Sequence, residues 1–163
     1  MLKRLGPHVE WVPFCPEVEA GMGVPREPVR LVGSDGAGDA SAVLGPRMLG
    51  VRSGRDWSQA LRGVAASRVE QLRALGVCGY VLKSRSPSCG MSVPVEAAQG
   101  SYPPWAASGL FAAVLRQEMP ELPIAEDAEL EVEANCELFL AAVEAYERAR
   151  STPRDRGLSE AAE

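Results

Sequence analysis

The stretch Val77-Cys78-Gly79-Tyr80-Val81-Leu82-Lys83-Ser84-Arg85-Ser86-Pro87-Ser88-Cys89-Gly90 decides the fold of this chain. It begins as an apolar run, which is typical of a strand that is buried on both faces. It ends in serine, proline and glycine, which favour a tight turn with free backbone donors. We therefore expect a strand over residues 77–82 and a loop over residues 83–90 at its carboxyl end. In open α/β sheets, ligands collect at that end of the strands.

A helix is predicted immediately before this strand, over residues 56–75. From Trp57 onward, apolar residues recur at steps of three and four, which indicates one buried helix face. Asp56 and Gln59 have the spacing of a capping box, and Gly76 suits a left-handed cap at the end. A helix, a glycine and then a strand make an α-to-β connection of a parallel sheet.

Shorter patterns predict the remaining elements. Apolar residues bounded by breakers indicate strands, and helical spacing behind a capping residue indicates helices. Glycine and proline make residues 21–28 a shaped loop, and residues 33–42 an exposed tract. The other expected helices end at residue 5, span 108–118 behind Ser108, and span 127–150 behind Asp127. The other expected strands span 8–14, 29–32, 47–51 and 122–125, and residues 91–105 are expected to be irregular.

Length and composition place the chain among ordinary globular proteins. Its 163 residues suffice for one domain, with 46% hydrophobic and 24% charged residues. A formal net charge of -5 argues against a general nucleic-acid surface, and no apolar run is long enough for a membrane span. No signal peptide opens the sequence, so the default location is cytoplasmic. We expect one α/β domain over residues 1–150 and a polar tail over residues 151–163.

The four cysteines divide into two pairs. In the cytoplasm they are more often thiols or metal ligands than disulfides. Cys136 belongs to an apolar stripe of the last helix and Cys78 lies inside the predicted strand, so both are expected in the core. Cys15 and Cys89 each follow a predicted strand, beside proline and polar residues, which favours a functional role. Their separation does not make a zinc-ribbon pattern, which needs close pairs.

Polar residues near Cys15 and Cys89 have both a chemical and a structural interpretation. Glu17 could hold a proton in the same cleft, or it could simply start a helix. Ser86 and Ser88 could shuttle protons or merely close the turn. Four basic residues could together bind an anion, although basic side chains more often simply face solvent. They are Lys83, Arg85, Arg26 and Arg30.

Several motifs agree in order and spacing with one known family. They are Trp11-Val12-Pro13-Phe14-Cys15-Pro16-Glu17-Val18-Glu19, Gly21-Met22-Gly23-Val24-Pro25-Arg26-Glu27-Pro28, and Gly79-Tyr80-Val81-Leu82-Lys83 followed by Ser86-Pro87-Ser88-Cys89-Gly90. With them the chain resembles the domain-of-unknown-function family five-two-three, whose characterised members include thiouracil desulfurase. The resemblance covers residues 1–150 and implies a three-layer Rossmann-like domain with a mostly parallel sheet.

The resemblance also implies a 4Fe-4S cluster on three cysteines, two of whose positions match Cys15 and Cys89. The iron without a protein ligand can bind the soft sulfur of a thiocarbonyl as a Lewis acid. Water then replaces the sulfur while a carboxylate and a hydroxyl move protons. Glu17 matches that carboxylate, and the hydroxyl is that of Ser86 or Ser88. The expected function is iron–sulfur-dependent removal of sulfur from a thiolated small molecule of the thiopyrimidine type.

The chain departs from the family at its start. Family members begin with a strand ending in a Ser-x-Cys-Leu-type motif that supplies the first cysteine, whereas Met1 falls after that point. We therefore expect the third ligand and the first strand to be absent. We favour a start chosen too far downstream over a degenerate form. The alternative to an enzyme is a non-catalytic metal- or anion-binding or interaction module. An unpaired face left by a missing strand would encourage self-association.

Overall fold

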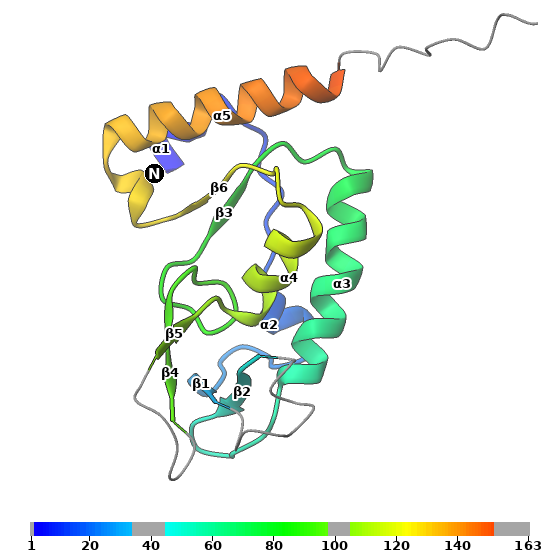
Figure 1. Ribbon diagram of the computed structural model, residues 1–163, viewed down its shortest axis with the longest axis vertical. Coiled ribbons are helices and arrows are strands. Elements are labelled where there is room, and N and C mark those ends of the chain that lie inside the picture. Colours follow the sequence, from blue (N-terminus) through cyan, green and yellow to red (C-terminus); the bar gives the residue numbers. More distant parts are fainter. Residues whose placement is uncertain (1, 34–44, 98–104, 152–163) are drawn as a thin grey trace, which may run out of the picture.

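A computed structural model of the chain describes residues 2–33, 45–97 and 105–151 and shows a mixed α/β fold (Figure 1). The helices are α1 (Leu2–Leu5), α2 (Pro16–Glu19), α3 (Ser58–Ala74), α4 (Leu110–Glu118), the 3-10 turn η2 (Glu129–Glu131) and α5 (Glu133–Ser151). The strands are β1 (Val29–Val32), β2 (Arg47–Gly50), β3 (Tyr80–Leu82), β4 (Val93–Glu96), β5 (Trp105–Ala107) and β6 (Ile124–Glu126). The expected α/β class is confirmed.

The strands of the described residues form two sheets. One has the order β2-β1-β4-β5, in which β1 pairs antiparallel with β2 and parallel with β4, and β5 pairs antiparallel with β4. The other consists of β3 and β6 in parallel, with Tyr80 opposite Ile124. The pairing is therefore mixed, and β2, which matches the strand expected over residues 47–51, lies at an edge.

Helix α3 connects the two sheets through its apolar face. Leu61 packs among side chains of the four-stranded sheet, and Val69 packs with Leu82 of β3. Phe111 of α4 is fully buried in the same cluster as Val69. Figure 1 shows α3 running along one side of the molecule, from the four-stranded sheet towards α5. The predicted helical stripe is confirmed, apart from Val64, which is only half-buried.

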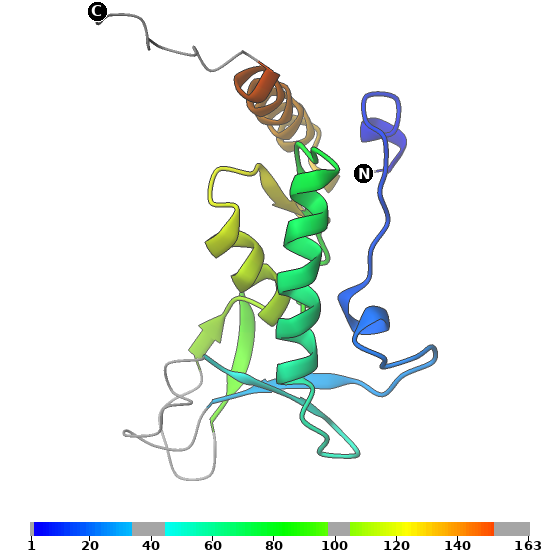
Figure 2. The same cartoon turned by 90° about the vertical axis from the view of Figure 1, so that its right-hand side faces the viewer.

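The predicted strand over residues 8–14 is wrong. His8 belongs to the turn after α1, and residues 9–14 have no regular secondary structure. They pair with no strand in the described part of the chain, and Figure 2 shows them passing along the outside from α1 to α2. Two of their side chains pack against different parts of the core. Val9 packs near Leu5, and the ring of Phe14 lies 5.2 Å from that of Phe111. Trp11 and Val12 are 41% and 48% exposed, so only Val9 and Phe14 of this apolar segment are packed against the core.

The expectation that residues 91–105 are irregular is also wrong, because they contain β4. Proline usually argues against a strand, since it lacks a backbone donor. Here Pro94 stands opposite Ala106 of β5, while β4 meets β1 only at the following residues Val95 and Glu96. Pro94 therefore lies outside the part of β4 that pairs with β1, so its missing N–H costs no hydrogen bond to β1.

The chain turns from α3 into β3 later than the sequence predicts. Gly76 has a φ of +68°, as expected for a left-handed cap, and Val77 donates its N–H to Leu72. The strand then begins at Tyr80. A side chain at Gly79 would lie 2.6 Å from Val143 of α5, so this glycine permits close packing of the last helix. Among the described helices, none has both the length and the apolarity that a membrane span requires.

The loop after β3 is fastened to the start of α4 by backbone hydrogen bonds. Phe111 donates its N–H to the carbonyl of Ser88, and Gly109 donates to that of Gly90, both at 2.8 Å. A Cβ atom at Gly109 would lie 2.6 Å from the carbonyl carbon of Ser88. Helix α4 therefore begins behind Gly109, and the expected cap residue Ser108 instead donates its hydroxyl to the carbonyl of Met91. Here only glycine lets the helix and the loop approach closely.

The other end of the loop is held by Asp127, which does not cap the last helix as expected. One carboxylate oxygen accepts from the N–H and the hydroxyl of Ser84, and the other accepts from Lys83 at 2.7 Å. These hydrogen bonds lower the pKa of Asp127 far below its ordinary value, although partial burial opposes them. The carboxylate thus joins the ends of β3 and β6, and α5 begins only at Glu133. The tract over residues 34–42 and the tail after Ser151 lie outside the described residues.

We predict that Gly109→Ala lowers the free energy of unfolding by about 1–3 kcal/mol, the usual cost of overpacking. Gly63→Ala is the matched control, because Gly63 lies in α3 with open space around it. Alanine there is expected to stabilise the helix by up to about 1 kcal/mol. Urea denaturation of both variants measures the difference. Equal stability of the two would show that the contact between α4 and the loop is looser than described.

We predict that Asp127→Asn lowers the free energy of unfolding by about 1 kcal/mol at neutral pH, because charged hydrogen bonds are lost. Since the folded-state pKa of Asp127 is lowered, its contribution is present above the unfolded-state pKa and disappears as the pH falls. The two proteins should therefore converge in stability only as the pH falls from the unfolded-state pKa of Asp127 towards its lower folded-state pKa. Urea denaturation across this range tests the trend. Glu144→Gln, at an exposed ion pair of α5, should show no such dependence; a constant difference for Asp127→Asn would contradict the prediction.

Candidate functional site

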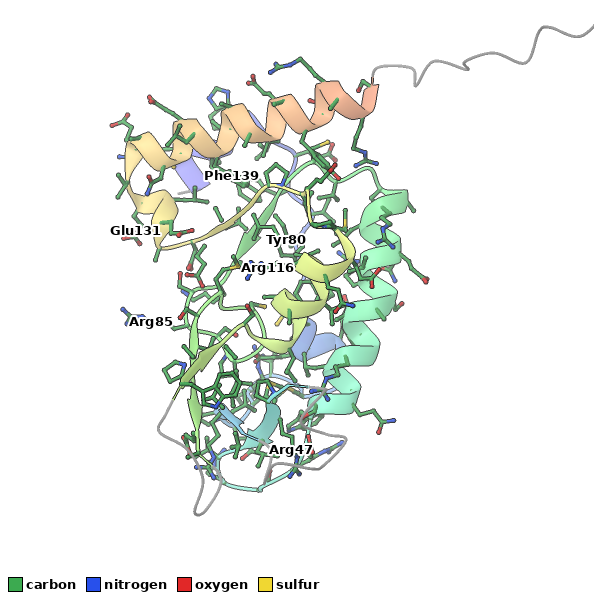
Figure 3. All side chains as sticks on the ribbon, viewed as in Figure 1. Arg47, Tyr80, Arg85, Arg116, Glu131 and Phe139 are labelled. Carbon is green, nitrogen blue, oxygen red and sulfur yellow. The ribbon has the colours of Figure 1, made fainter. Side chains whose placement is uncertain are left out.

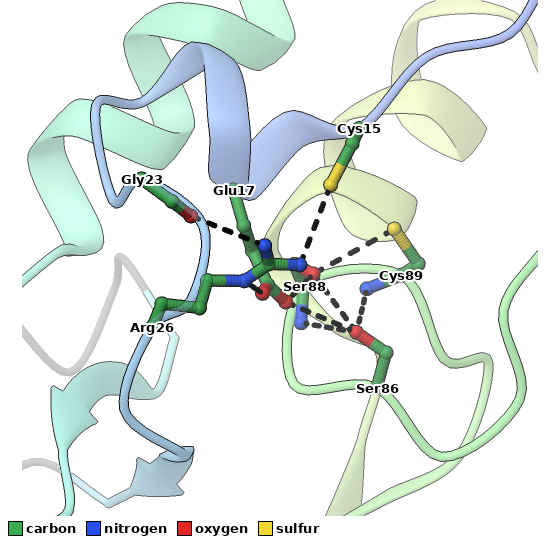
Figure 4. A network of polar contacts seen from close by, with 7 residues as sticks. All are labelled: Cys15, Glu17, Gly23, Arg26, Ser86, Ser88 and Cys89. Atoms are coloured by element: carbon green, nitrogen blue, oxygen red, sulfur yellow. Dashed lines mark hydrogen bonds and ion pairs between the residues drawn. The ribbon is translucent and has the colours of Figure 1, made fainter.

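Two segments that are distant in sequence meet at the candidate site. Cys15 precedes α2 and occupies its N-cap position, and Glu17 follows in the first turn. The loop after β3 brings Ser88 and Cys89 to the same place, since α4 anchors its backbone. Figure 4 shows the two cysteine sulfurs and the Glu17 carboxylate gathered between α2 and this loop. All the site residues predicted from the sequence are therefore brought together.

The carboxylate of Glu17 is the centre of a hydrogen-bond network. Its Oε1 accepts the hydroxyl of Ser88 at 2.6 Å, and its Oε2 accepts Nε of Arg26 at 2.5 Å. The side chain of Glu17 is only 13% exposed, so these partners replace most of its contact with water. The hydrogen bond with Glu17 in turn raises the pKa of Arg26. The carboxylate therefore has a fixed orientation, with one oxygen on each partner.

Ser86 and Ser88 occupy different positions in this network. Ser88 is buried and closest to Glu17, whereas the Ser86 hydroxyl lies 3.4 Å from the same oxygen and 2.9 Å from the Ser88 hydroxyl. Ser86 Oγ also accepts the backbone N–H groups of Ser88 and Cys89. Ser86 therefore shapes the turn, and Ser88 makes the direct contact with the carboxylate.

The two thiols border this network and form no disulfide. Cys15 Sγ lies 3.6 Å from Nη2 of Arg26, and Cys89 Sγ lies 3.6 Å from the Ser88 hydroxyl. Burial raises the pKa of Cys89 to about 11, and the charges of Glu17 and Cys15 add to the effect, while the Ser88 hydroxyl opposes it. The thiols therefore share one electrostatic environment with the carboxylate.

The other two cysteines are elsewhere. Cys136 is 3% exposed and donates its thiol to the carbonyl of Leu130, so its predicted place in the core is confirmed. Cys78 lies before β3 and not within it, half-buried, with its thiol directed to the carbonyl of Gly76. Its predicted place in a buried strand is wrong, and its thiol is directed to Gly76 and not to the network around Glu17.

The sequence names Arg26 only as one of four cations of a candidate anion site and as part of the family motif over residues 21–28. Its contacts with Glu17 and Cys15 were not predicted. Of those four, Arg85 points away from the molecule in Figure 3, and Arg30 forms an exposed ion pair with Glu96. Lys83 pairs with Asp127. An anion surface shared by the four is therefore absent from the described residues.

A cluster held by three cysteines fits these residues only in part. The donor chemistry is right at two positions, since Cys15 and Cys89 offer soft thiolates that face one space. No group of three histidine, cysteine, aspartate or glutamate side chains in the described ranges is arranged to hold a metal ion. With Cys78 and Cys136 remote, this sequence supplies two of the three expected thiolates.

The chain is similar to known proteins in sequence and in structure. TudS, a 4Fe-4S-dependent thiouracil desulfidase, is a similar solved structure, with a TM-score of 0.59 and 25% identity, covering 84% of this chain and 81% of TudS. The uncharacterised protein YbbK of Bacillus subtilis (strain 168) is 28% identical over 116 residues, which are 71% of this chain and 74% of YbbK. The model of the 2-thiouracil desulfurase family matches residues 1–127, and the chain therefore belongs to that family.

Proposed function

We propose that this chain acts in the iron–sulfur-dependent removal of sulfur from a thiolated pyrimidine. The observation that carries the proposal is the contact of the buried Ser88 hydroxyl with Glu17 Oε1 at 2.6 Å, between two free thiols. A proton-transfer pair beside soft metal ligands is the combination that exchange of sulfur for water requires. Membership of the 2-thiouracil desulfurase family and similarity to TudS support the same chemistry.

Cys15 and Cys89 are the residues that would hold iron in this proposal. Thiolates are the usual protein ligands of iron–sulfur clusters, and both thiols are reduced and directed to one space. A bound cluster would supply a soft Lewis acid for the sulfur of a thiocarbonyl group. Cys15 and Cys89 are the two ligands that we assign within these 163 residues, and the third ligand that the resemblance implies is not assigned.

Glu17 and Ser88 are the proposed proton-transfer groups. Replacing the sulfur of a thiocarbonyl by the oxygen of water yields a carbonyl and hydrogen sulfide, so both protons of the water must reach the departing sulfur. Glu17 can take a proton at Oε1 and exchange it with the Ser88 hydroxyl, which lies 3.6 Å from Cys89 Sγ. Ser88 is preferred to Ser86 because the Ser86 oxygen is occupied by two backbone N–H groups.

We also propose a finer description of the fold. Residues 1–150 would form one three-layer Rossmann-like domain with a mostly parallel sheet that lacks its first strand. Two of the four strand pairs in the described residues, β1–β4 and β3–β6, are parallel and support this arrangement, whereas β1–β2 and β4–β5 are antiparallel. Within the described residues β3 is paired along one edge only, so a further parallel strand would fit on its other edge.

Anaerobic reconstitution of the full chain with iron and sulfide tests the ligands. We expect visible iron–thiolate absorption, and we expect Cys15→Ala and Cys89→Ala each to reduce the iron bound, because each removes one ligand. Cys78→Ala is the matched control, since its thiol is remote from the site. Unchanged absorption in the first two variants would overturn the ligand assignment. No absorption in the unmodified chain would instead favour a non-catalytic module of the same fold.

Release of sulfide from a thiopyrimidine such as 2-thiouracil tests the proton-transfer pair. We expect Glu17→Gln and Ser88→Ala to lower the rate by about 10²–10⁴-fold, the usual contribution of general acid–base groups. Ser86→Ala should have a smaller effect, because Ser86 mainly holds the turn. Iron content, measured in parallel, separates loss of proton transfer from loss of metal. If Ser86→Ala proves more damaging than Ser88→Ala at equal iron content, the assignment of the two serines is reversed.

A further inference from the structure

We propose that Arg26 is the positioning residue of this site, which fixes Glu17 and Cys15 relative to each other and leaves one carboxylate oxygen facing Ser88. This inference rests on the proposed function and adds a residue to it. The guanidinium makes a different contact through each nitrogen: Nε donates to Glu17 Oε2, Nη2 lies by Cys15 Sγ at 3.6 Å, and Nη1 donates to the Gly23 carbonyl at 3.3 Å.

The planar shape of the guanidinium is what makes these contacts a constraint. Its donors lie in a fixed fork, so satisfying three acceptors at once defines both the position and the plane of the group. The backbone carbonyl of Gly23 accepts from Nη1 and so helps to fix the plane of the guanidinium. The Glu17 carboxylate and the Cys15 sulfur are then held at a separation that the guanidinium determines. A lysine ammonium is a single point and cannot hold the same three groups in one plane.

Burial distinguishes this ion pair from the other ion pairs of arginine in the described residues. The Arg26 and Glu17 side chains are 28% and 13% exposed, whereas those of Arg30 and Glu96 are 45% and 53% exposed at the same 2.5 Å separation. Solvent screens exposed pairs and lets their side chains move, so they contribute little. The pair at the site is screened less, and its geometry is correspondingly more defined.

The consequence for Glu17 is that its two oxygens are no longer equivalent. Arg26 occupies Oε2, and Oε1 is the oxygen in contact with Ser88. A proton is therefore received and released on the side of Ser88 alone. Without Arg26, the carboxylate would be free to rotate away from Ser88, and misplacement of a catalytic group by about 1 Å can cost about 10²-fold in rate.

The surroundings of Arg26 make this inference testable by chemical rescue. Besides contacting Glu17 and Cys15, Arg26 lines an open cavity of about 420 Å³ together with Met22, Pro25, Glu27, Arg52, Ser53 and Trp57. Truncation to alanine would extend this cavity to the Glu17 carboxylate. A guanidinium ion from solution could then enter from the open side and occupy the vacated place.

The kinetic experiment compares Arg26→Ala and Arg26→Lys with the control Arg30→Ala, which breaks the exposed pair with Glu96. We expect Arg26→Ala to lower kcat for sulfide release about 10²-fold while KM changes little, because a proton-transfer group is misplaced. Methylguanidinium should restore part of the loss in Arg26→Ala only, and Arg26→Lys should retain intermediate activity. A large rise in KM with unchanged kcat, or no response to methylguanidinium, would overturn the positioning role.

A second measurement does not depend on turnover and separates the two proposals. In the ¹⁵N-labelled full chain, before iron is added, the Arg26 Nε–H should give an exchange-protected NMR signal that Glu17→Gln removes and Ser88→Ala preserves. If this signal is present but sulfide release is absent from the unmodified chain, the proposed function fails while the placement of Glu17 by Arg26 stands. If Glu17→Gln and Ser88→Ala lower turnover but the signal exchanges rapidly, the inference about Arg26 fails alone.

Discussion

The structure depends on the contact between the start of α4 and the loop that follows β3. The first N–H groups of a helix have no partner within the helix, and here they bond to carbonyls of the loop, including those of Ser88 and Gly90. That bonding requires the two backbones to approach so closely that no side chain fits at Gly109. One constraint therefore satisfies the helix and at the same time places the Ser88 hydroxyl and the Cys89 thiol.

The segment that carries Cys15 and Glu17 is held against α4 and the loop after β3 by side-chain contacts and not by strand pairing. The segment before α2 pairs with no strand among the described residues, and it is held by the packing of Phe14 on Phe111 and by the bonds of Glu17 to Ser88 and Arg26. Glu17 is therefore both a candidate proton carrier and one of the links that keep the segment in place. A substitution at Glu17 will change the position of Cys15 as well as the chemistry.

Much of the site was predictable from the sequence because its residues lie in two short, contiguous segments. Cys15-Pro16-Glu17 and Ser86-Pro87-Ser88-Cys89-Gly90 each form one short turn, and motif order placed both turns at one site. Which serine makes the closer contact with Glu17 was not predictable, since it depends on which serine oxygen accepts hydrogen bonds from the backbone N–H groups of the loop. The helix starts at Ser108 and Asp127 were wrong for a similar reason: both side chains have partners distant in sequence, Met91 and the end of β3. The strand over residues 8–14 was wrong because an apolar pattern does not identify a pairing partner, and Trp11 and Val12 of this segment are in fact exposed.

The charges of the site explain why these groups are arranged together. Glu17 and Arg26 form an ion pair, and Arg26 Nη2 also lies 3.6 Å from Cys15 Sγ, so one cation is shared by the carboxylate and that thiol. Burial and the nearby carboxylate both raise the pKa of Cys89 and so disfavour its thiolate form. A soft metal cation that bound the sulfur directly would favour the thiolate instead. The ion pair therefore does more than orient a carboxylate. In the proposed function, an ion pair that satisfies Glu17 within the protein would keep that carboxylate from competing with the thiolates for iron, and would leave it available for proton transfer.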